Sequence, residues 1–231
     1  MMPILVADCV TKRYAGRTVL SSATLRAVPG LVRALFGRNG AGKSTLMKIA
    51  AGWHQPDSGC VRWEGSARLR VTLAGLAGRG LFYLPDQDLL SDAFTLRSQL
   101  EMIRQRRDGG DLALAATVVG VERYLDRRPN ELSGGERRRA ELAAILVARP
   151  RCLLADEPYR GIAPVDAEVI SVVLRGLAAG GTAIVVTGHE TGTLLDAADH
   201  VTWCTSGTTY ELGSSAEARM HDGFRTEYLG R

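Results

Sequence analysis

The segment 37–45 constrains this chain more than any other part of its 231 residues. It reads Gly-Arg-Asn-Gly-Ala-Gly-Lys-Ser-Thr, in which Gly-x-x-x-x-Gly-Lys-Ser is the informative spacing. The apolar residues 31–36 before it predict a strand, and residues 45–51 after it predict a helix. Backbone N–H groups of a glycine-rich loop and the positive end of the following helix dipole form a cradle for phosphate oxygens. Strand, loop and helix in this order therefore predict a phosphate-binding site.

Each residue type in this loop, called the P-loop below, has a physical role. Lys43 places a positive charge beside the β and γ phosphates of a triphosphate, and the hydroxyl of Ser44 is an oxygen ligand for Mg²⁺. We expect the glycines at 37, 40 and 42 to adopt positive φ, where a Cβ would be unfavourable. The candidate nucleotide-binding residues of the loop are Gly37, Asn39, Gly40, Ala41, Gly42, Lys43, Ser44 and Thr45.

The composition excludes several classes of protein. Hydrophobic residues at 45% and charged residues at 23% are ordinary for a globular domain. The net charge is +4, but the basic residues are spread along the chain, so we expect no nucleic-acid partner. The four cysteines are far apart and form no Cys-x-x-Cys pair, so neither a zinc site nor a disulfide framework is predicted.

The sequence also predicts neither a signal peptide nor a membrane span. The N-terminus lacks a charged region before its apolar residues, and Asp8 interrupts the apolar stretch. The most apolar longer segment, residues 170–186, is broken by Arg175 and two glycines, whereas a spanning helix needs about 18 or more apolar residues.

The order of apolar segments predicts an α/β fold. Short strands in residues 4–36 predict an antiparallel layer at the N-terminus, and residues 60–65 a further strand. Strands at 152–155 and 182–187, with a helix at about 165–179 between them, predict a mostly parallel sheet with flanking helices.

The segment 96–149 has helical periodicity instead. We therefore predict one domain, residues 1–231, with a core from 1–88 and 150–231 and an inserted α-helical subdomain at about 89–149. A strand pair and a short helix are expected in residues 203–231.

Two carboxylates follow the predicted strand 152–155. Asp156 and Glu157 come at its carboxyl end, the edge of an α/β sheet where ligands bind. Beside a triphosphate, Asp156 can hold Mg²⁺ directly or through water, and Glu157 can act as general base for the attacking water. We predict these roles for the pair.

A second glycine-containing segment opens a helix. Leu132 is followed by Ser133, Gly134, Gly135 and Glu136. Ser133 is a good N-cap, and Glu136 three residues later completes a capping box. Because capping alone does not require two adjacent glycines, we interpret Ser133, Gly134 and Gly135 as a second phosphate-binding element.

With these motifs in this order, nearly the whole chain resembles the ATP-binding cassette ATPases, the nucleotide-binding subunits of ABC transporters. Segment 37–45 is similar to the Walker A motif, segment 132–136 to the ABC signature and segment 152–158 to the Walker B strand with its catalytic glutamate. The resemblance implies a P-loop NTPase core, ATP and Mg²⁺ as ligands, and ATP hydrolysis.

The resemblance also suggests roles for single residues. His189, in Thr-Gly-His after a strand, is similar to the switch histidine that contacts the γ phosphate, so Glu157, His189 and Lys43 are the expected catalytic residues. Tyr14 matches the aromatic residue that stacks on adenine, although a core tyrosine is the alternative.

The family implies partners as well. Two cassettes, identical or paralogous, dimerise head to tail, so Ser133 and Gly135 of one would cover ATP held by the other. Transmembrane permease subunits would dock near residues 89–100. The resemblance thus implies a cytoplasmic protein bound peripherally to the inner face of the cell membrane.

The sequence departs from the family pattern at two places. The Q-loop motif Leu-Pro-Gln is replaced by Leu-Pro-Asp-Gln, so either Asp86 or Gln87 takes the glutamine's place; we favour Gln87 as the metal ligand, with Ser44 and Asp156. In the D-loop, Ala163 stands where similar proteins have aspartate. We expect weaker communication between the two sites of the dimer, not loss of hydrolysis.

The resemblance is greatest to cassettes of branched-chain amino acid import and lipopolysaccharide export, through the Thr-x-His motif and the ending at residues 227–230. It fixes neither cargo nor direction of transport. The alternatives are a non-transport ABC ATPase and a low-turnover, ATP-gated regulatory cassette, which the two departures keep open.

Overall fold

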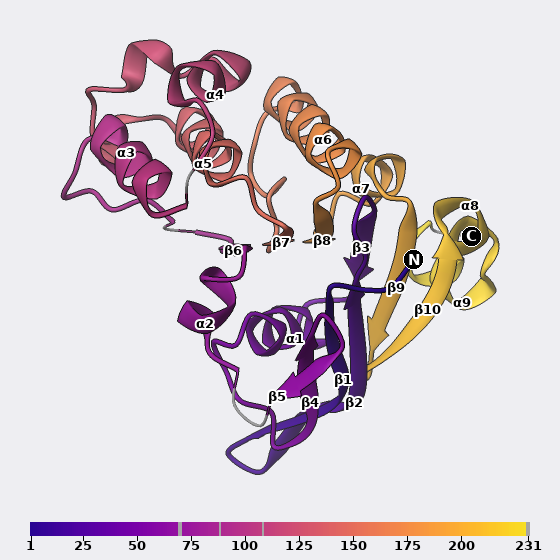
Figure 1. Cartoon of the computed structure of the whole chain (residues 1–231). Coiled ribbons are helices and arrows are strands. Elements are labelled where there is room, and N and C mark those ends of the chain that lie inside the picture. Colours follow the sequence, from indigo (N-terminus) through magenta and orange to yellow (C-terminus); the bar gives the residue numbers. More distant parts are fainter. Residues whose placement is uncertain (69–70, 88, 108, 230–231) are drawn as a thin grey trace.

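The computed structural model describes residues 1–68, 71–87, 89–107 and 109–229. Within these residues the chain forms two β-sheets with helices on both faces of the larger one (Figure 1). This arrangement confirms the predicted α/β class with an antiparallel N-terminal layer.

The first sheet is antiparallel and has the strand order β2-β1-β4-β5. Ala7 of the central strand pairs with Leu25 on one side and Val61 on the other, and all three are buried. The apolar side chains therefore lie on the face of this sheet that covers the core. Its strands are β1 (Leu5–Tyr14), β2 (Arg17–Ala27), β4 (Ser58–Trp63) and β5 (Ser66–Arg68).

The second sheet has the order β10-β9-β3-β8-β7-β6, and all neighbours are parallel except β10 and β9. Four of its strands, β3, β6, β7 and β8, are buried along their whole length, which explains why their residues are apolar except for Arg33 in β3 and Thr187 in β8. The strands are β3 (Val32–Phe36), β6 (Leu81–Leu84), β7 (Cys152–Ala155), β8 (Ala183–Thr187), β9 (His200–Thr205) and β10 (Thr208–Ser214).

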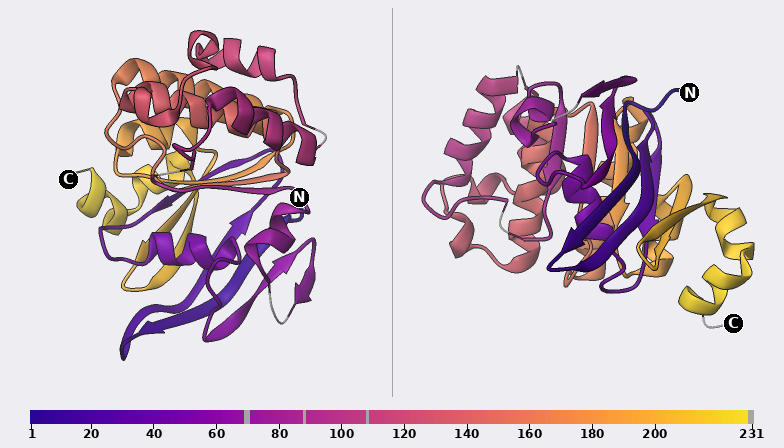
Figure 2. Two further views of the ribbon diagram at one scale, coloured as in Figure 1. Left: turned by 90° about the vertical axis from the view of Figure 1, so that its left-hand side faces the viewer. Right: turned by 90° about the horizontal axis from the view of Figure 1, so that it is seen from below.

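Helix α1 (Lys43–Ala50) and the antiparallel sheet cover one face of this core sheet, and α6 (Pro164–Ala179) and α7 (Thr191–Ala197) cover the other (Figure 2). Neighbouring residues of β3 pack on opposite faces of the sheet. Leu35 belongs to the hydrophobic cluster around α1, and Phe36 belongs to the cluster around α6. The carboxyl ends of the parallel strands are thus held between two packed layers.

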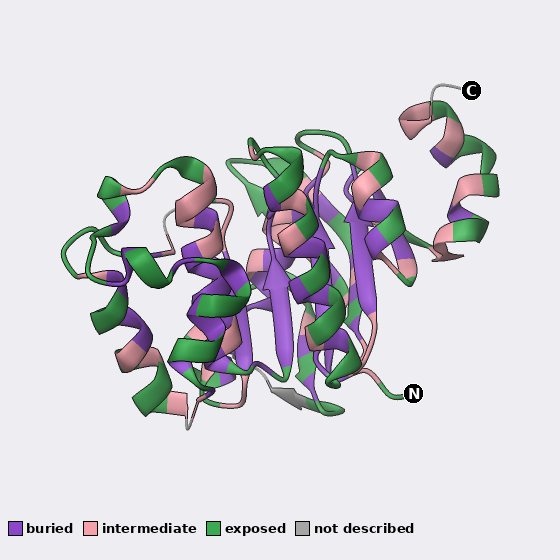
Figure 3. Ribbon diagram, turned by 90° about the horizontal axis from the view of Figure 1, so that it is seen from above, coloured by how far each residue is buried: buried purple, intermediate pink, exposed green. Residues whose placement is uncertain are grey.

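Three helices form the expected helical group, α3 (Leu96–Arg107), α4 (Leu112–Val119) and α5 (Gly134–Ala148), with short 3₁₀ turns at Glu122–Tyr124 and Pro129–Glu131. Their inward residues, such as Leu100, Ala116 and Ile145, are fully buried and join the cluster around α6. Exposed residues face outward along the helices (Figure 3). The group therefore shares a core with one face of the sheet.

The C-terminal part contains two short helices, α8 (Ser215–Met220) and α9 (Asp222–Tyr228), where the sequence predicted one. Phe224 of α9 packs edge-on against Phe36 of β3, with ring centroids 5.2 Å apart. The resemblance noted at residues 227–230 ends at Gly230, which lies outside the described residues. No helix in the described ranges is long and apolar enough to cross a membrane.

Some elements differ from the expectation. Only short strands were predicted in residues 4–36, but β2 runs without a break over 11 residues. Ser22 has a φ of 56°, and the register with β1 shifts there, so a bulge accommodates the polar interruption without ending the pairing. The short elements β5, α2 (Leu73–Ala77) and α7 were not predicted, because each is shorter than a clear periodic pattern.

Candidate active site

The P-loop connects β3 to α1 through a turn in which Gly40 and Gly42 both have positive φ. Gly42 is the N-cap of α1 with a φ of 107°, and a Cβ there would lie 2.6 Å from Cδ2 of Leu20. Gly37 does not have positive φ, so the expectation for this glycine was wrong. A Cβ at Gly37 would instead lie 2.5 Å from the carbonyl oxygen of Cys204, so close packing requires this glycine.

Lys43 is the first residue of α1 and is only 5% exposed. Its Nζ donates a hydrogen bond to the carbonyl oxygen of Gly37 at 2.6 Å, within the loop itself. Burial lowers the pKa of Lys43, and the carboxylates of Glu157 and Asp156 oppose that shift. The ammonium group is thus held inside the loop and faces the carboxylates that follow β7.

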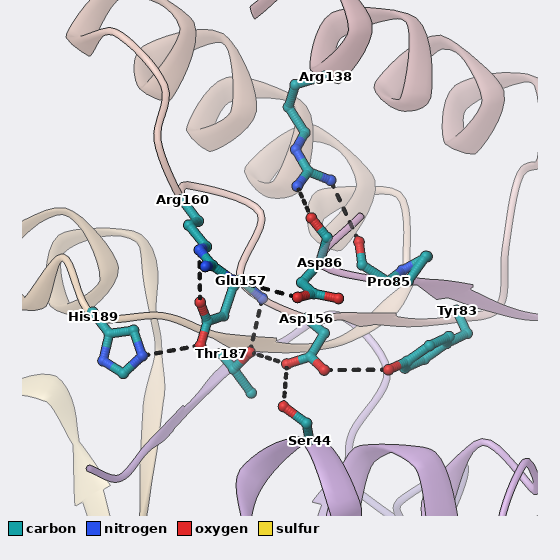
Figure 4. A network of polar contacts seen from close by, with 10 residues as sticks. All are labelled: Ser44, Tyr83, Pro85, Asp86, Arg138, Asp156, Glu157, Arg160, Thr187 and His189. Atoms are coloured by element: carbon teal, nitrogen blue, oxygen red, sulfur yellow. Dashed lines mark hydrogen bonds and ion pairs between the residues drawn. The ribbon is translucent and has the colours of Figure 1, made fainter. Parts of the chain in front are cut away.

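Asp156 is 2% exposed and is the centre of a hydrogen-bond network (Figure 4). Its Oδ1 accepts from Thr187 Oγ1 at 2.7 Å and from Ser44 Oγ at 3.3 Å, and its Oδ2 accepts from the Tyr83 hydroxyl at 3.2 Å. The ends of β6, β7 and β8 and the start of α1 therefore converge on one carboxylate.

The donor set around Asp156 fits Mg²⁺. This hard cation takes oxygen ligands, and it is bound by one or two protein groups together with phosphate oxygens and waters. Ser44 and Asp156 offer a hydroxyl and a carboxylate side by side. In the part of the chain that the structure describes, no cluster of three or more His, Cys, Asp or Glu side chains could hold a metal by itself. The hydroxyl and the carboxylate would leave the other ligand positions of such an ion to phosphate oxygens and waters.

Glu157 adjoins this network in an unusual backbone conformation. It is a non-glycine residue with a φ of 49°, and its N–H donates to Thr187 Oγ1 at 2.8 Å. Nε2 of His189 lies 2.9 Å from Oε1 of Glu157, and Nε of Arg160 lies 3.9 Å from Oε2 (Figure 4). Backbone strain of this kind is concentrated at functional sites, because the surrounding contacts have to maintain it.

The signature segment begins α5 as predicted. Ser133 Oγ accepts from the N–H of Glu136, and the Glu136 carboxylate accepts from the N–H of Ser133. Hydrogen bonds from Tyr124 and Ser133 lower the pKa of Glu136 to about 2. A Cβ at Gly134 would meet no atom within 4 Å, so the backbone there is open to an approaching ligand.

Comparisons with known proteins decide the family. The ABC transporter family matches residues 20–160. This chain belongs to that family. The lipopolysaccharide export system ATP-binding proteins of Haemophilus influenzae and Acidithiobacillus ferridurans are 28% and 30% identical to the cassette, over 99% and 100% of its length and 98% of each relative. A solved ATP-binding cassette of an ABC transporter has a TM-score of 0.86 at 22% identity, covering 99% of both chains.

Gly135 of the cassette has a structural role that the sequence did not reveal. A Cβ at this position would lie 2.3 Å from Oδ2 of Asp166, which is 9% exposed and pairs with Arg139 at 3.1 Å. Asp166 is therefore engaged within its own chain.

Two predicted site residues lie outside the network around Asp156. Tyr14 is 42% exposed at the end of β1, with Lys12 Nζ 5.6 Å from its ring centroid. Gln87 is exposed after β6, where it lines a cavity of about 260 Å³ with Gly134 and Arg160. Their roles in binding adenine and metal remain predictions.

Sequence reasoning missed three residues of the cassette's network. Thr187 was read only as part of a motif, yet its hydroxyl connects Asp156 to the backbone of Glu157. Tyr83 and Arg160 contact these two carboxylates from β6 and from the turn after Glu157. The signal that could have found Tyr83 is its place three residues before the Q-loop position 86, at the end of a strand.

Proposed function

We propose that this cassette binds ATP with Mg²⁺, hydrolyses it within a cassette dimer and drives transmembrane permease subunits. The observation that carries the proposal is the pairing of Glu157 with His189 next to the carboxylate of Asp156, at the carboxyl edge of the sheet. The P-loop supplies the phosphate cradle beside it.

The side chains divide the work of hydrolysis. Lys43 and the N-terminus of α1 bind the β and γ phosphates. Ser44 and Asp156 would hold Mg²⁺, which neutralises developing phosphate charge when it is bound. Glu157 accepts a proton from the attacking water, and His189 orients its carboxylate and reaches the γ phosphate.

The signature segment completes the site of a second copy. The hydroxyl oxygen of Ser133 accepts a hydrogen bond from the N–H of Glu136 in the first turn of α5. Gly134 has no side chain, so the N-terminus of the helix stays accessible. An accessible helix N-terminus with glycines suits the γ phosphate of ATP bound by a partner cassette. We infer that an isolated protomer hydrolyses ATP slowly and that ATP-dependent dimerisation activates it.

The cassette would meet its membrane partner between the Q-loop and the helical group. Phe94 in this region is 52% exposed, as expected for an apolar docking contact. Through permease subunits the cassette would work at the cytoplasmic face of the cell membrane.

Substitution of Glu157 by glutamine tests the proposal most directly. General bases typically contribute about 10²–10⁴-fold to a rate, so Glu157→Gln should lower ATP turnover to that extent and accumulate an ATP-bound dimer in size-exclusion chromatography. Glu190→Gln is the matched control, because it neutralises an exposed carboxylate one residue beyond His189. Turnover at the wild-type rate by Glu157→Gln contradicts the assigned mechanism.

A further inference from the structure

The carboxylate of Glu157 lies between the imidazole of His189 and the guanidinium of Arg160, and the two contacts differ in length. Its Oε1 is 2.9 Å from Nε2 of His189, within hydrogen-bonding distance. Its Oε2 is 3.9 Å from Nε of Arg160, which is an ion pair without a hydrogen bond. The guanidinium is therefore close enough to compete for Glu157, yet it is not bound to it.

The backbone that carries Arg160 is fixed relative to Glu157. The N–H of Arg160 donates to the carbonyl oxygen of Glu157 at 3.1 Å, closing a turn. Tyr159 inside that turn is 2% exposed, and its hydroxyl lies 3.1 Å from Ser171 Oγ. The Arg160 side chain, by contrast, is 57% exposed. This side chain is therefore freer to reorient than the backbone that carries it, and it borders the cavity of about 260 Å³ at the start of α5.

Asp86 is the partner that holds the guanidinium. Its Oδ2 lies 3.4 Å from NH1 of Arg160, within hydrogen-bonding distance and nearer than Glu157 (Figure 4). The main chain of Asp86 is itself anchored, because its carbonyl oxygen accepts from NH2 of Arg138 at 2.8 Å. Arg138 is buried and pairs with Glu141 at 2.7 Å within α5. The Q-loop is thereby connected to the signature helix.

We propose that Asp86 and Arg160 form a switch on Glu157. In the observed position of the Q-loop, the Asp86 carboxylate binds the guanidinium of Arg160, and Glu157 contacts His189. When the Q-loop moves away, Arg160 is released and pairs with Glu157. A guanidinium that hydrogen-bonds the Glu157 carboxylate turns it away from His189 and covers the oxygen that the attacking water would otherwise reach.

The switch rests on the proposed function, in which Glu157 is the general base and permease subunits dock beside the Q-loop. It adds a specific consequence: displacement of segment 85–87 would lower the catalytic rate without changing the P-loop contacts to nucleotide. It also assigns the extra carboxylate at 86 a positioning role, distinct from that of a metal ligand.

Epistasis between the two residues tests the switch. ATP turnover is measured for the full chain with Asp86→Asn alone and in combination with Arg160→Ala. An exposed ion pair at the upper end of the usual range is equivalent to about a fivefold change in rate, so Asp86→Asn should lower kcat about fivefold with an unchanged KM for ATP. Removal of Arg160 in that background should raise kcat at least threefold above that of Asp86→Asn.

Asp196→Asn is the matched control. Asp196 lies on α7, away from the site, and it also pairs with an exposed arginine, Arg219, at 2.6 Å. The switch is overturned if Asp86→Asn matches the wild type, or if the double variant is as slow as Asp86→Asn, as expected for a metal ligand at 86. If Glu157→Gln hydrolyses ATP at the wild-type rate, both the proposed function and the switch are contradicted. Glu157-dependent turnover without the epistasis contradicts the switch alone.

Discussion

Oγ1 of Thr187 lies 2.7 Å from Oδ1 of Asp156, which joins the last residue of β8 to the first residue after β7. The same hydroxyl oxygen accepts the N–H of Glu157 at 2.8 Å. Thr187 is fully buried, so both partners depend on it for a hydrogen bond that water does not replace. One hydroxyl thus fixes the spacing between the candidate metal ligand and the candidate base.

Thr187→Val should therefore affect both stability and catalysis. Valine has nearly the same shape but leaves the partly buried N–H of Glu157 without its acceptor, which costs about 1–3 kcal/mol. We also expect kcat to fall, because the strained backbone of Glu157 loses its anchor. Urea unfolding and steady-state ATPase assays measure the two effects.

Thr182→Val is a matched control, because Thr182 immediately precedes the opposite end of β8. Thr182 is buried and donates to the Pro150 carbonyl at 2.8 Å, so its loss should destabilise the fold to a similar degree. It contacts no site residue, and kcat should stay at the wild-type value. An equal fall in kcat for the two variants would show that Thr187 acts through stability alone.

The two signature glycines should respond differently to alanine. Gly135→Ala places a Cβ against the Asp166 carboxylate and should destabilise the fold by about 1–3 kcal/mol through overpacking. Gly134→Ala enters open space and should leave stability unchanged or raise it by up to about 1 kcal/mol, while it hinders ATP-dependent dimerisation. Thermal unfolding and size-exclusion chromatography with ATP separate these outcomes.

Truncation of Asp166 gives an internal check on this interpretation. In the double variant Gly135→Ala with Asp166→Ala, the carboxylate that the new Cβ meets is absent. Its stability should exceed the sum expected from the two single variants. Additive losses would mean that the contact between these positions is not what excludes a side chain at 135.

The local motifs were predictable because their chemistry is encoded within a few residues. Gly42, Lys43 and Ser44 lie at the start of α1, as the spacing required, and Ser133 caps α5 through the predicted box. Asp156 and Glu157 follow a fully buried strand. In each case a turn, a cap or a strand end can be recognised without knowledge of its neighbours in space.

The contacts between motifs were not predictable, since they depend on register and packing. Tyr83 reaches Asp156 because β6 and β7 pair in parallel with Tyr83 opposite Leu154. Gly37 is required by the Cys204 carbonyl, a residue of β9 that is distant in sequence. Asp86 could be recognised as a departure from the family, but its pairing with Arg160 appears only once the strands are assembled.

The capping box of α5 should make stability depend on acidic pH. The pKa of Glu136 is about 2 in the folded chain, below its usual value of 4.5, because Tyr124 and Ser133 donate to the carboxylate. Its stabilising contribution is therefore present above about pH 4.5 and is lost as pH falls towards 2. Glu136→Gln should be less stable than the wild type at neutral pH, with the difference narrowing between pH 4.5 and 2.

Chemical denaturation across this pH range measures that difference. Glu168→Gln removes an exposed carboxylate from α6 and reports the effect of net charge alone. A constant difference between the wild type and Glu136→Gln from pH 5 to pH 2 would contradict the role of this carboxylate.

Ala163 offers a last test, because it is both the N-cap of α6 and the D-loop position that lacks aspartate. Its side chain makes no capping hydrogen bond, so Ala163→Ser and Ala163→Asp should each stabilise the fold by about 0.5–2 kcal/mol. Only aspartate adds a charge at the inferred dimer seam, so only Ala163→Asp should steepen the dependence of turnover on ATP concentration. If serine steepens it equally, order at the start of α6 controls communication between sites and the carboxylate does not.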